Sequence, residues 1–203
     1  MNLVCGVGVN DAPYIVDVRQ LVGYVGGRRK YRVVWTCPYY RTWANMLSRC
    51  YNIGYQKKSP TYVDCSVCEE WQLFSNFRSW MEQQDWEGKQ IDKDILSPKN
   101  RVYGPEVCVF VSKQVNIFVT ERGASRGEWP IGVYWNKNKQ RFNAQCNNPI
   151  SKKRENLGYF TCPEEAHQTW LKRKLELARL LAEEQDDPRV ANALVERYAS
   201  YAL

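Results

Sequence analysis

The chain has 203 residues, 44% of them hydrophobic, which is enough for one large domain or two small ones, each with a core. Its apolar runs are too short to cross a bilayer and its first residues lack the pattern of a signal peptide, so we expect an intracellular protein and exclude a membrane protein. The net charge of +7 and the 13% aromatic residues favour nucleic acid as a partner, although a merely basic soluble protein has the same balance.

The first 36 residues predict a β-rich N-terminal segment whose function the sequence does not indicate. Leu21 to Trp35 has the pattern of a hairpin, because Gly26-Gly27 separates two runs of β-branched and aromatic residues. Two helices follow. Trp43, Met46 and Cys50 recur at helical spacing, and the stretch from Phe74 to Met81 does the same.

Eight cysteines in an intracellular chain indicate metal ligands or buried thiols and not disulfides. Cys65 and Cys68 have the spacing of a two-ligand knuckle, and Cys50 and Cys108 are the candidates that would complete a structural zinc site. A single Cys-x-x-Cys pair is weaker evidence than two, and free cysteine is often buried. Unligated thiols are therefore the favoured alternative.

Gln90 to Asn116 predicts a strand, a turn-rich loop, a second strand and the start of a helix. The second strand is Val107 to Val111, and Ser112 is placed to cap the helix. The first strand ends in Asp92-Lys93-Asp94, whose carboxylates suit a hard divalent cation such as magnesium or manganese. The alternative without a functional role is that these residues form a solvated strand end with a local ion pair.

Residues 121–127 are rich in Gly, Ser and Arg, so we place a linker there. The following residues, 128–185, predict three strands and one long helix, with Pro163 in the first turn of that helix. A final amphipathic helix, 186–203, has Val190, Leu194 and other apolar residues on one face. That face packs back on the core or, as the less favoured alternative, forms a dimer contact.

The predicted fold class is therefore α+β, with five parts. They are a β-rich segment (1–36), a domain with a small two-strand-and-helix core surrounded by helices (37–120), a linker (121–127), a three-stranded antiparallel sheet packed on one long helix (128–185), and a C-terminal helix (186–203).

The strand–loop–strand–helix order of Gln90 to Asn116 resembles the His-Asn-His (HNH, or ββα-metal) nuclease motif of phage homing endonucleases. The preceding Trp…Met-Leu…Arg-Cys…Val-Cys-x-Glu-Trp…Phe…Phe…Trp-Met series resembles the region before a degenerate HNH motif in such proteins. The resemblance implies that Asp92 and Asn116 hold a divalent metal, and that Lys93 stands where the family has its histidine base.

Lys93 changes the chemistry that the resemblance implies, because lysine is a poor base at its reference pKa of about 10.4. Three possibilities follow: a metal-bound water loses its proton without a side-chain base; Lys93 contacts phosphate while Asp94 assists with the proton; or the site is inactive and the fold is kept as a scaffold.

The pattern Ile-Gly-Val-x-Trp…Arg-Phe-x-Ala…Leu-Gly-Tyr-Phe-x-x-x-Glu-Glu-Ala in residues 131–166 is similar to the apetala/ethylene-response-factor DNA-binding domain. The resemblance implies a sheet that lies in the major groove and reads bases with its exposed side chains. The matching candidates are Tyr134, Trp135, Lys137, Arg141, Asn143, Gln145 and Arg154. Their residue types suit bases and phosphate, since Asn and Gln pair with adenine and Arg with guanine.

From these observations we expect a phage-type homing endonuclease that cleaves double-stranded DNA with a divalent metal, in the cytoplasm of an infected bacterium, as a monomer or weak dimer. The alternative is an inactive HNH scaffold that binds DNA or a host defence or replication protein. RNA is a third possible partner, because basic and aromatic content does not separate the two nucleic acids.

Overall fold

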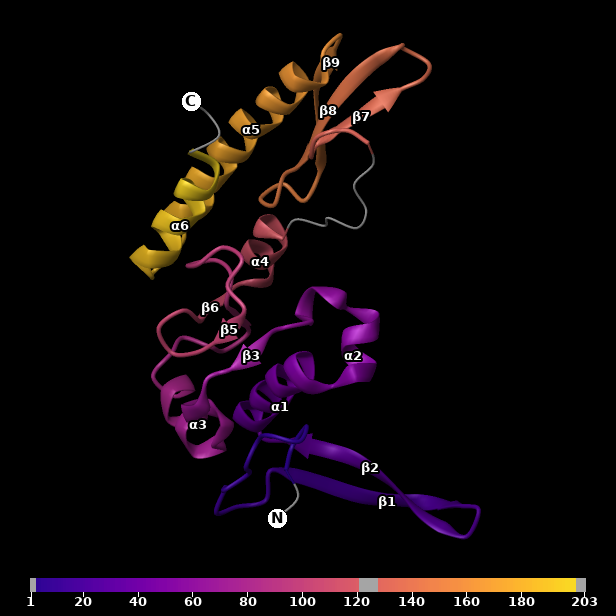
Figure 1. The fold of residues 1–203 in the computed structure, drawn as a ribbon, viewed down its shortest axis with the longest axis vertical. Helices are drawn as coiled ribbons and strands as arrows, with labels where there is room; N and C mark the ends of the chain where they lie inside the picture. Colours follow the sequence, from indigo (N-terminus) through magenta and orange to yellow (C-terminus); the bar gives the residue numbers. More distant parts are fainter. Residues whose placement is uncertain (1–2, 121–127, 200–203) are drawn as a thin grey trace. The chain divides into compact units, whose positions relative to one another are not determined.

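The computed structural model describes residues 3–120 and 128–199, and its contacts divide the chain into two units, Met1–Phe110 and Val111–Leu203. Helices and strands are mixed in sequence and form several small sheets, so the fold class is α+β as predicted (Figure 1). No helix in the described part of the chain has the length and apolar character needed to cross a membrane.

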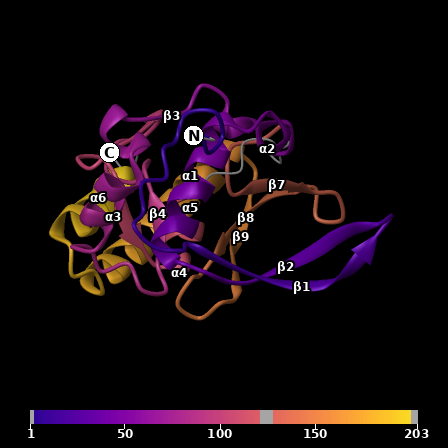
Figure 2. The same cartoon turned by 90° about the horizontal axis from the view of Figure 1, so that it is seen from below.

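The N-terminal unit begins with an antiparallel hairpin, strands β1 (Asp17–Val25) and β2 (Arg28–Thr36), joined by Gly26-Gly27 as the sequence predicts. Both glycines have positive φ, which a two-residue hairpin turn requires. The hairpin projects from the rest of the unit in both views (Figures 1 and 2). The remaining elements are α1 (Pro38–Tyr51), α2 (Ile53–Lys58), β3 (Ser66–Val67), α3 (Phe74–Met81), β4 (Gln90–Asp92), β5 (Val102–Tyr103) and β6 (Val109–Val111), with short 3-10 turns at Pro60–Tyr62 and Glu69–Gln72.

The core of the N-terminal unit is aromatic and lies between α1 and α3. Trp43, Trp71 and Phe77 are fully buried, and the indole N–H of Trp43 donates to the carbonyl of Trp71 at 2.7 Å. Two small sheets complete the unit: β3 pairs with β5 in parallel, and β4 pairs with β6. The β4–β6 pair is the two-strand part of the predicted HNH-like element.

The C-terminal unit contains α4 (Lys113–Val119), the antiparallel sheet β7 (Val133–Asn136), β8 (Arg141–Asn147) and β9 (Arg154–Phe160), the long helix α5 (Pro163–Glu183) and α6 (Pro188–Ala199). Helix α5 covers one face of the sheet, where Phe142, Ala144 and Ala166 are buried together. Helix α6 packs along α5 and buries Val190, Leu194 and Tyr198, so its apolar face is used within the chain.

The unit boundary after Phe110 differs from the predicted linker at 121–127, which lies outside the described residues. The difference arises because α4 packs on the C-terminal helices. The carbonyl of Phe118 accepts from Lys174 Nζ at 2.7 Å and from the Tyr198 hydroxyl at 3.3 Å. The Phe118 ring lies 5.5 Å from the Tyr198 ring and 3.4 Å from Lys174 Nζ. Helix α4 therefore belongs to the C-terminal unit, together with α5 and α6.

An ion pair fastens the last strand of the sheet to α5. Arg173 donates two hydrogen bonds to Glu155, at 2.7 and 3.0 Å. Arg173, and then a hydrogen bond from Asn148, hold the pKa of Glu155 at about 2. Since this folded-state pKa lies below the unfolded one, the stabilisation is present above a pH of about 4.5 and is lost as the pH falls towards 2.

We expect Glu155→Gln to lower the free energy of unfolding by about 1 kcal/mol at pH 7, because the pair is bidentate but about a quarter exposed. The deficit should shrink as the pH falls below about 4.5. Urea denaturation of wild type and variant between pH 7 and 3 measures it. Glu176→Gln, which removes the more exposed partner of the same arginine, is the control and should cost less. An equal deficit at both ends of the pH range would contradict this account.

Candidate functional site

The first candidate site is the end of β4, where the predicted catalytic residues lie. Oδ1 of Asp92 accepts hydrogen bonds from the backbone N–H groups of Asp94 and Ile95, both at 2.8 Å. Among the described residues nothing donates to its second oxygen. Burial raises the pKa of Asp92, and the two backbone hydrogen bonds act against that rise. A half-buried carboxylate whose second oxygen has no donor among the described residues fits a divalent cation, which would also stabilise its charged form.

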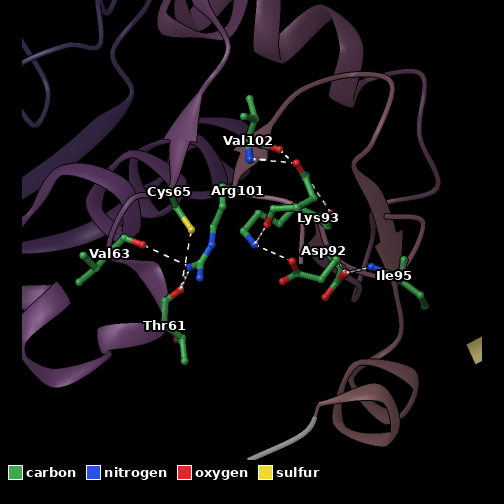
Figure 3. A network of polar contacts seen from close by, with 10 residues as sticks. Thr61, Val63, Cys65, Asp92, Lys93, Ile95, Arg101 and Val102 are labelled. Atoms are coloured by element: carbon green, nitrogen blue, oxygen red, sulfur yellow. Dashed lines mark hydrogen bonds and ion pairs between the residues drawn. The ribbon is translucent and has the colours of Figure 1, made fainter. Parts of the chain in front are cut away.

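Lys93 is buried, with 5% of its surface exposed, and does not lie free at a solvated strand end. Its Nζ donates to Asp94 Oδ1 at 2.7 Å and to the carbonyl of Asn100 at 2.6 Å. Asn100 donates in return to the carbonyl of Lys93 at 3.0 Å and to that of Val102 at 2.6 Å. Figure 3 shows Lys93 held within this network beside Asp92. The alternative prediction of a solvated ion pair is therefore wrong. The hydrogen bonds between Lys93 and Asn100 instead hold the loop after β4 closed.

The two hydrogen bonds donated by Lys93 limit the chemistry that this side chain can perform. Its Nζ donates hydrogen bonds to the carboxylate of Asp94 and to the carbonyl of Asn100. A side chain tethered in this way is not free to take a proton from a water molecule. The geometry therefore gives Lys93 a positioning role for the loop, and it leaves Asp94, whose side chain is 47% exposed, as the accessible member of the pair.

Asn116, the predicted second metal ligand, lies on α4 and is half-buried. It belongs to the C-terminal unit, whereas Asp92 belongs to the N-terminal unit. Neither unit by itself contains both residues of the implied metal pair.

The four candidate zinc ligands are all in the N-terminal unit. Cys50, Cys65 and Cys108 are buried and Cys68 is half-buried. Burial raises the pKa of Cys50 and that of Cys108 to about 12, so the neutral thiol is the stable form there. Zinc needs thiolates. Within the described ranges, no three His, Cys, Asp or Glu side chains are grouped as a metal site. The structural zinc stays a prediction.

The second candidate site is the face of the β7–β9 sheet turned away from α5. Because alternate residues of a strand point to opposite faces and the register pairs Tyr134 with Asn143 and Asn143 with Tyr159, one face can be assigned. We define this open face by its side chains: Tyr134, Arg141, Asn143, Gln145, Arg154, Asn156 and Tyr159. Most of them are exposed.

All charged side chains in residues 129–154, which include most of the open face, are positive. Residues 129–154 contain six cations, Lys137, Lys139, Arg141, Lys152, Lys153 and Arg154, and no carboxylate. All six are exposed. They lie on the open face or in the turns at its two ends. An ordinary solvated sheet face mixes both signs, whereas a stretch this long without an acidic residue makes a surface of positive potential.

Polar side chains on the open face are held in fixed positions by one another. Gln145 donates to the Tyr134 hydroxyl at 2.7 Å. The amide of Asn143 donates to Asn156 Oδ1 at 2.7 Å and to the carbonyl of Gly158 at 2.8 Å. At the edge of the face, Lys139 Nζ lies 3.9 Å from the centre of the Tyr159 ring. Side chains fixed in this way lose little conformational freedom when a ligand binds.

Two of the predicted base-contacting residues are not exposed on the open face: Asn143 is buried within it, and Trp135 points to the other side of the sheet. Asn143 is fully buried because Tyr134 and Tyr159 lie on either side of it across the strands, so it supports the open face from beneath. Trp135 points to the α5 side, as the residue after Tyr134 must, and its ring packs on Phe142 at 4.8 Å. Tyr134, Lys137, Arg141, Gln145 and Arg154 remain on the open face or in its turn.

Sequence reasoning missed Tyr159, Asn156 and the pair Lys152-Lys153. The Lys-Lys-Arg run ending in Arg154 is visible in the sequence, but only the register shows that Tyr159 lies opposite Asn143. No family model, curated protein or solved structure matches the chain.

Proposed function

We propose that the protein binds duplex DNA through the open face of the β7–β9 sheet. The observation that carries the proposal is the single sign of charge over residues 129–154, combined with exposed tyrosines and amides on one face of a rigid sheet. Lysine and arginine at the rim suit phosphates, while Arg141 and Gln145 are residue types that pair with base edges.

Two further features agree with this assignment. Helix α5 covers the opposite face of the sheet, so the open face alone is available to a large ligand. In addition, Oδ1 of the buried Asn143 lacks a donor among the described residues. A buried acceptor just beneath a binding face is commonly satisfied by ordered water, and water-mediated contacts are frequent in DNA interfaces.

We expect Arg141→Ala to weaken binding to a duplex by about 1–3 kcal/mol, or roughly 5- to 150-fold, if the arginine contacts a base edge. Fluorescence anisotropy with a labelled duplex measures the change. Arg179→Ala is a matched control, because Arg179 is an exposed arginine on α5, outside the open face. Equal affinities of wild type and Arg141→Ala would show that this face is not the binding surface.

Metal-dependent cleavage of that DNA, of the HNH homing-endonuclease type, is the second candidate function. The observation that favours it is Asp92, a half-buried carboxylate with one oxygen free of donors among the described residues. A divalent cation bound there would polarise the scissile phosphate. Asp92 would hold the cation, and the hydrogen bonds between Lys93 and Asn100 would keep the loop ordered. The engaged Lys93 favours the inactive scaffold over a fast nuclease.

We expect Asp92→Asn without added metal to be as stable as wild type or more so at pH 7. Asparagine keeps an oxygen acceptor for the two backbone N–H groups and removes a charge that burial disfavours. We expect a melting temperature raised by roughly 2–4 °C at most. With magnesium or manganese, wild type should gain stability and the variant should not. Supercoiled DNA cut by wild type and spared by Asp92→Asn would establish the nuclease, and intact DNA beside clear binding would leave the scaffold.

A further inference from the structure

The β1–β2 hairpin is a ribbon of two long strands without a covering layer. Of its eighteen strand residues, all but Asp17, Gly23 and Thr36 are exposed. It is fastened at its base, where the N–H of Cys37 donates to the carbonyl of Val16 at 2.8 Å. A two-stranded ribbon alone is marginally stable in water, so a ribbon of this length, with Tyr24, Val25 and other apolar residues exposed, is suited to a partner.

The register separates the side chains of the ribbon into two different faces. Up to the bulge at Val34, Arg28, Lys30 and Arg32 alternate along β2 and therefore share a face, opposite Val25, Gly23 and Gln20 of β1. We call this the cationic face. The reverse face carries Leu21, Tyr24, Tyr31 and Val33 beside Arg19 and Arg29.

Charge on the ribbon indicates what kind of partner it fits. Between Asp17 and Thr36 there are five cations and one carboxylate, which leaves a net charge of +4 on a tenth of the chain. A second copy of the ribbon would bring like charges together, which disfavours self-association. A polyanion is complementary to it.

The dimensions of the ribbon favour duplex DNA among the polyanions. The strands of a sheet lie about 4.8 Å apart, and the major groove of B-form DNA, about 12 Å wide, admits a two-stranded ribbon. Alternate residues of a strand are about 6.7 Å apart, close to the axial rise of two nucleotides at about 3.4 Å each. Three cations at this spacing match every second nucleotide of one DNA strand, so they can meet alternate phosphates or base edges without rearrangement.

We propose that the β1–β2 hairpin lies in the major groove of duplex DNA with its cationic face towards the DNA, as a second contact separate from the open face of the β7–β9 sheet. This inference rests on the proposed function for its choice of duplex DNA. It gives a role to the N-terminal segment, 1–36, whose function the sequence does not indicate.

The test uses the full chain with Arg28→Gln, Lys30→Gln and Arg32→Gln combined. We expect affinity for a 30-base-pair duplex to fall roughly 10- to 100-fold at low salt. The slope of log affinity against log salt should become less steep by about 2 to 3, since each phosphate contact contributes about 0.9. A matched control removes three exposed cations elsewhere, Lys57, Lys58 and Lys172, and should change affinity less than 3-fold. Equal melting temperatures verify that both variants fold.

Three outcomes would overturn the inference. One is a triple variant that binds DNA as wild type does while Arg141→Ala is weakened, which would leave the sheet as the only contact. Another is an equal loss on A-form duplex RNA, whose narrow major groove excludes a ribbon, because that would indicate a general electrostatic patch. The last is binding to a different partner. A change in mass by light scattering that the triple variant loses would assign the ribbon to a second copy of the chain. Binding to anionic lipid vesicles that the triple variant loses would assign it to a membrane surface. No DNA binding by wild type would instead remove the proposed function itself.

Discussion

Gly132→Ala is expected to lower the free energy of unfolding of the C-terminal unit by about 3 kcal/mol or more. Gly132 has a φ of +82°, and a Cβ at this position would lie 2.2 Å from Cδ1 of the Trp170 ring. The left-handed backbone alone costs an alanine about 1–2 kcal/mol. The remainder comes from displacing Trp170, which is 7% exposed and stacks on His167 at 5.5 Å.

Gly88→Ala separates the two contributions in this prediction. Gly88 also has a positive φ, of +71°, but a Cβ there meets nothing within 4 Å, so this variant should cost only the backbone term of about 1–2 kcal/mol. Guanidinium denaturation followed by tryptophan fluorescence gives both values. Equal losses in the two variants would mean that the close approach of Gly132 to Trp170 does not limit the stability of the C-terminal unit.

Trp43→Ala is expected to have the largest effect in the N-terminal unit, about 3–5 kcal/mol. The Trp43 side chain is fully buried, and its ring lies 5.4 Å from Phe74. Removing it leaves a cavity between α1 and α3. It also leaves the carbonyl of Trp71, which accepts the indole N–H at 2.7 Å, without that donor.

Trp35→Ala is the matched control for Trp43→Ala. Trp35 is 48% exposed on the hairpin, so its removal should change the free energy of unfolding by no more than about 0.5 kcal/mol. Chemical denaturation of both variants measures the contrast. Similar losses at the two tryptophans would contradict the position of the core, and a large loss at Trp35 would show that the hairpin contributes to the fold of the N-terminal unit.

The three-stranded sheet and its helix could be predicted because their local signals agree. The three strands predicted within residues 128–185 are found at Val133–Asn136, Arg141–Asn147 and Arg154–Phe160, and the helix begins at Pro163. Strand alternation, turn residues and an N-terminal proline are all local in the chain. The opposite orientation of Trp135 from Tyr134 was also predictable, since neighbouring strand residues point to opposite faces.

Residues whose environment comes from distant parts of the chain could not be predicted. Asn143 is a polar residue on a polar strand face, yet it is fully buried, with Tyr134 and Tyr159 paired beside it on the neighbouring strands. Lys93 lies in a charged run that looks solvated, but Asn100 closes the loop over it. In the same way, α4 follows β6 directly in the chain but groups with Lys174, fifty-six residues after Phe118.

The candidate catalytic site shows the limit of motif reasoning most clearly. The order of β4, β6 and α4 agrees with the expected strand–loop–strand–helix order, and Asp92 keeps a free oxygen among the described residues. The motif implies a base at position 93, whereas the structure holds that side chain in two polar contacts. For this reason we rank DNA binding above cleavage.

The most direct test of the central claim is the affinity of the wild-type protein for a duplex DNA measured over a range of salt concentrations. If the open face binds the phosphate backbone with about four of its six cations, log affinity should fall linearly with log salt, and these contacts alone should contribute about −3 to −4 to the slope. The hairpin contacts inferred above would make the wild-type slope steeper by about a further 2 to 3. Arg154→Gln should make the slope less steep by about 0.9. No binding at low salt, or an affinity that does not change with salt, would contradict the account and direct the search to a protein partner.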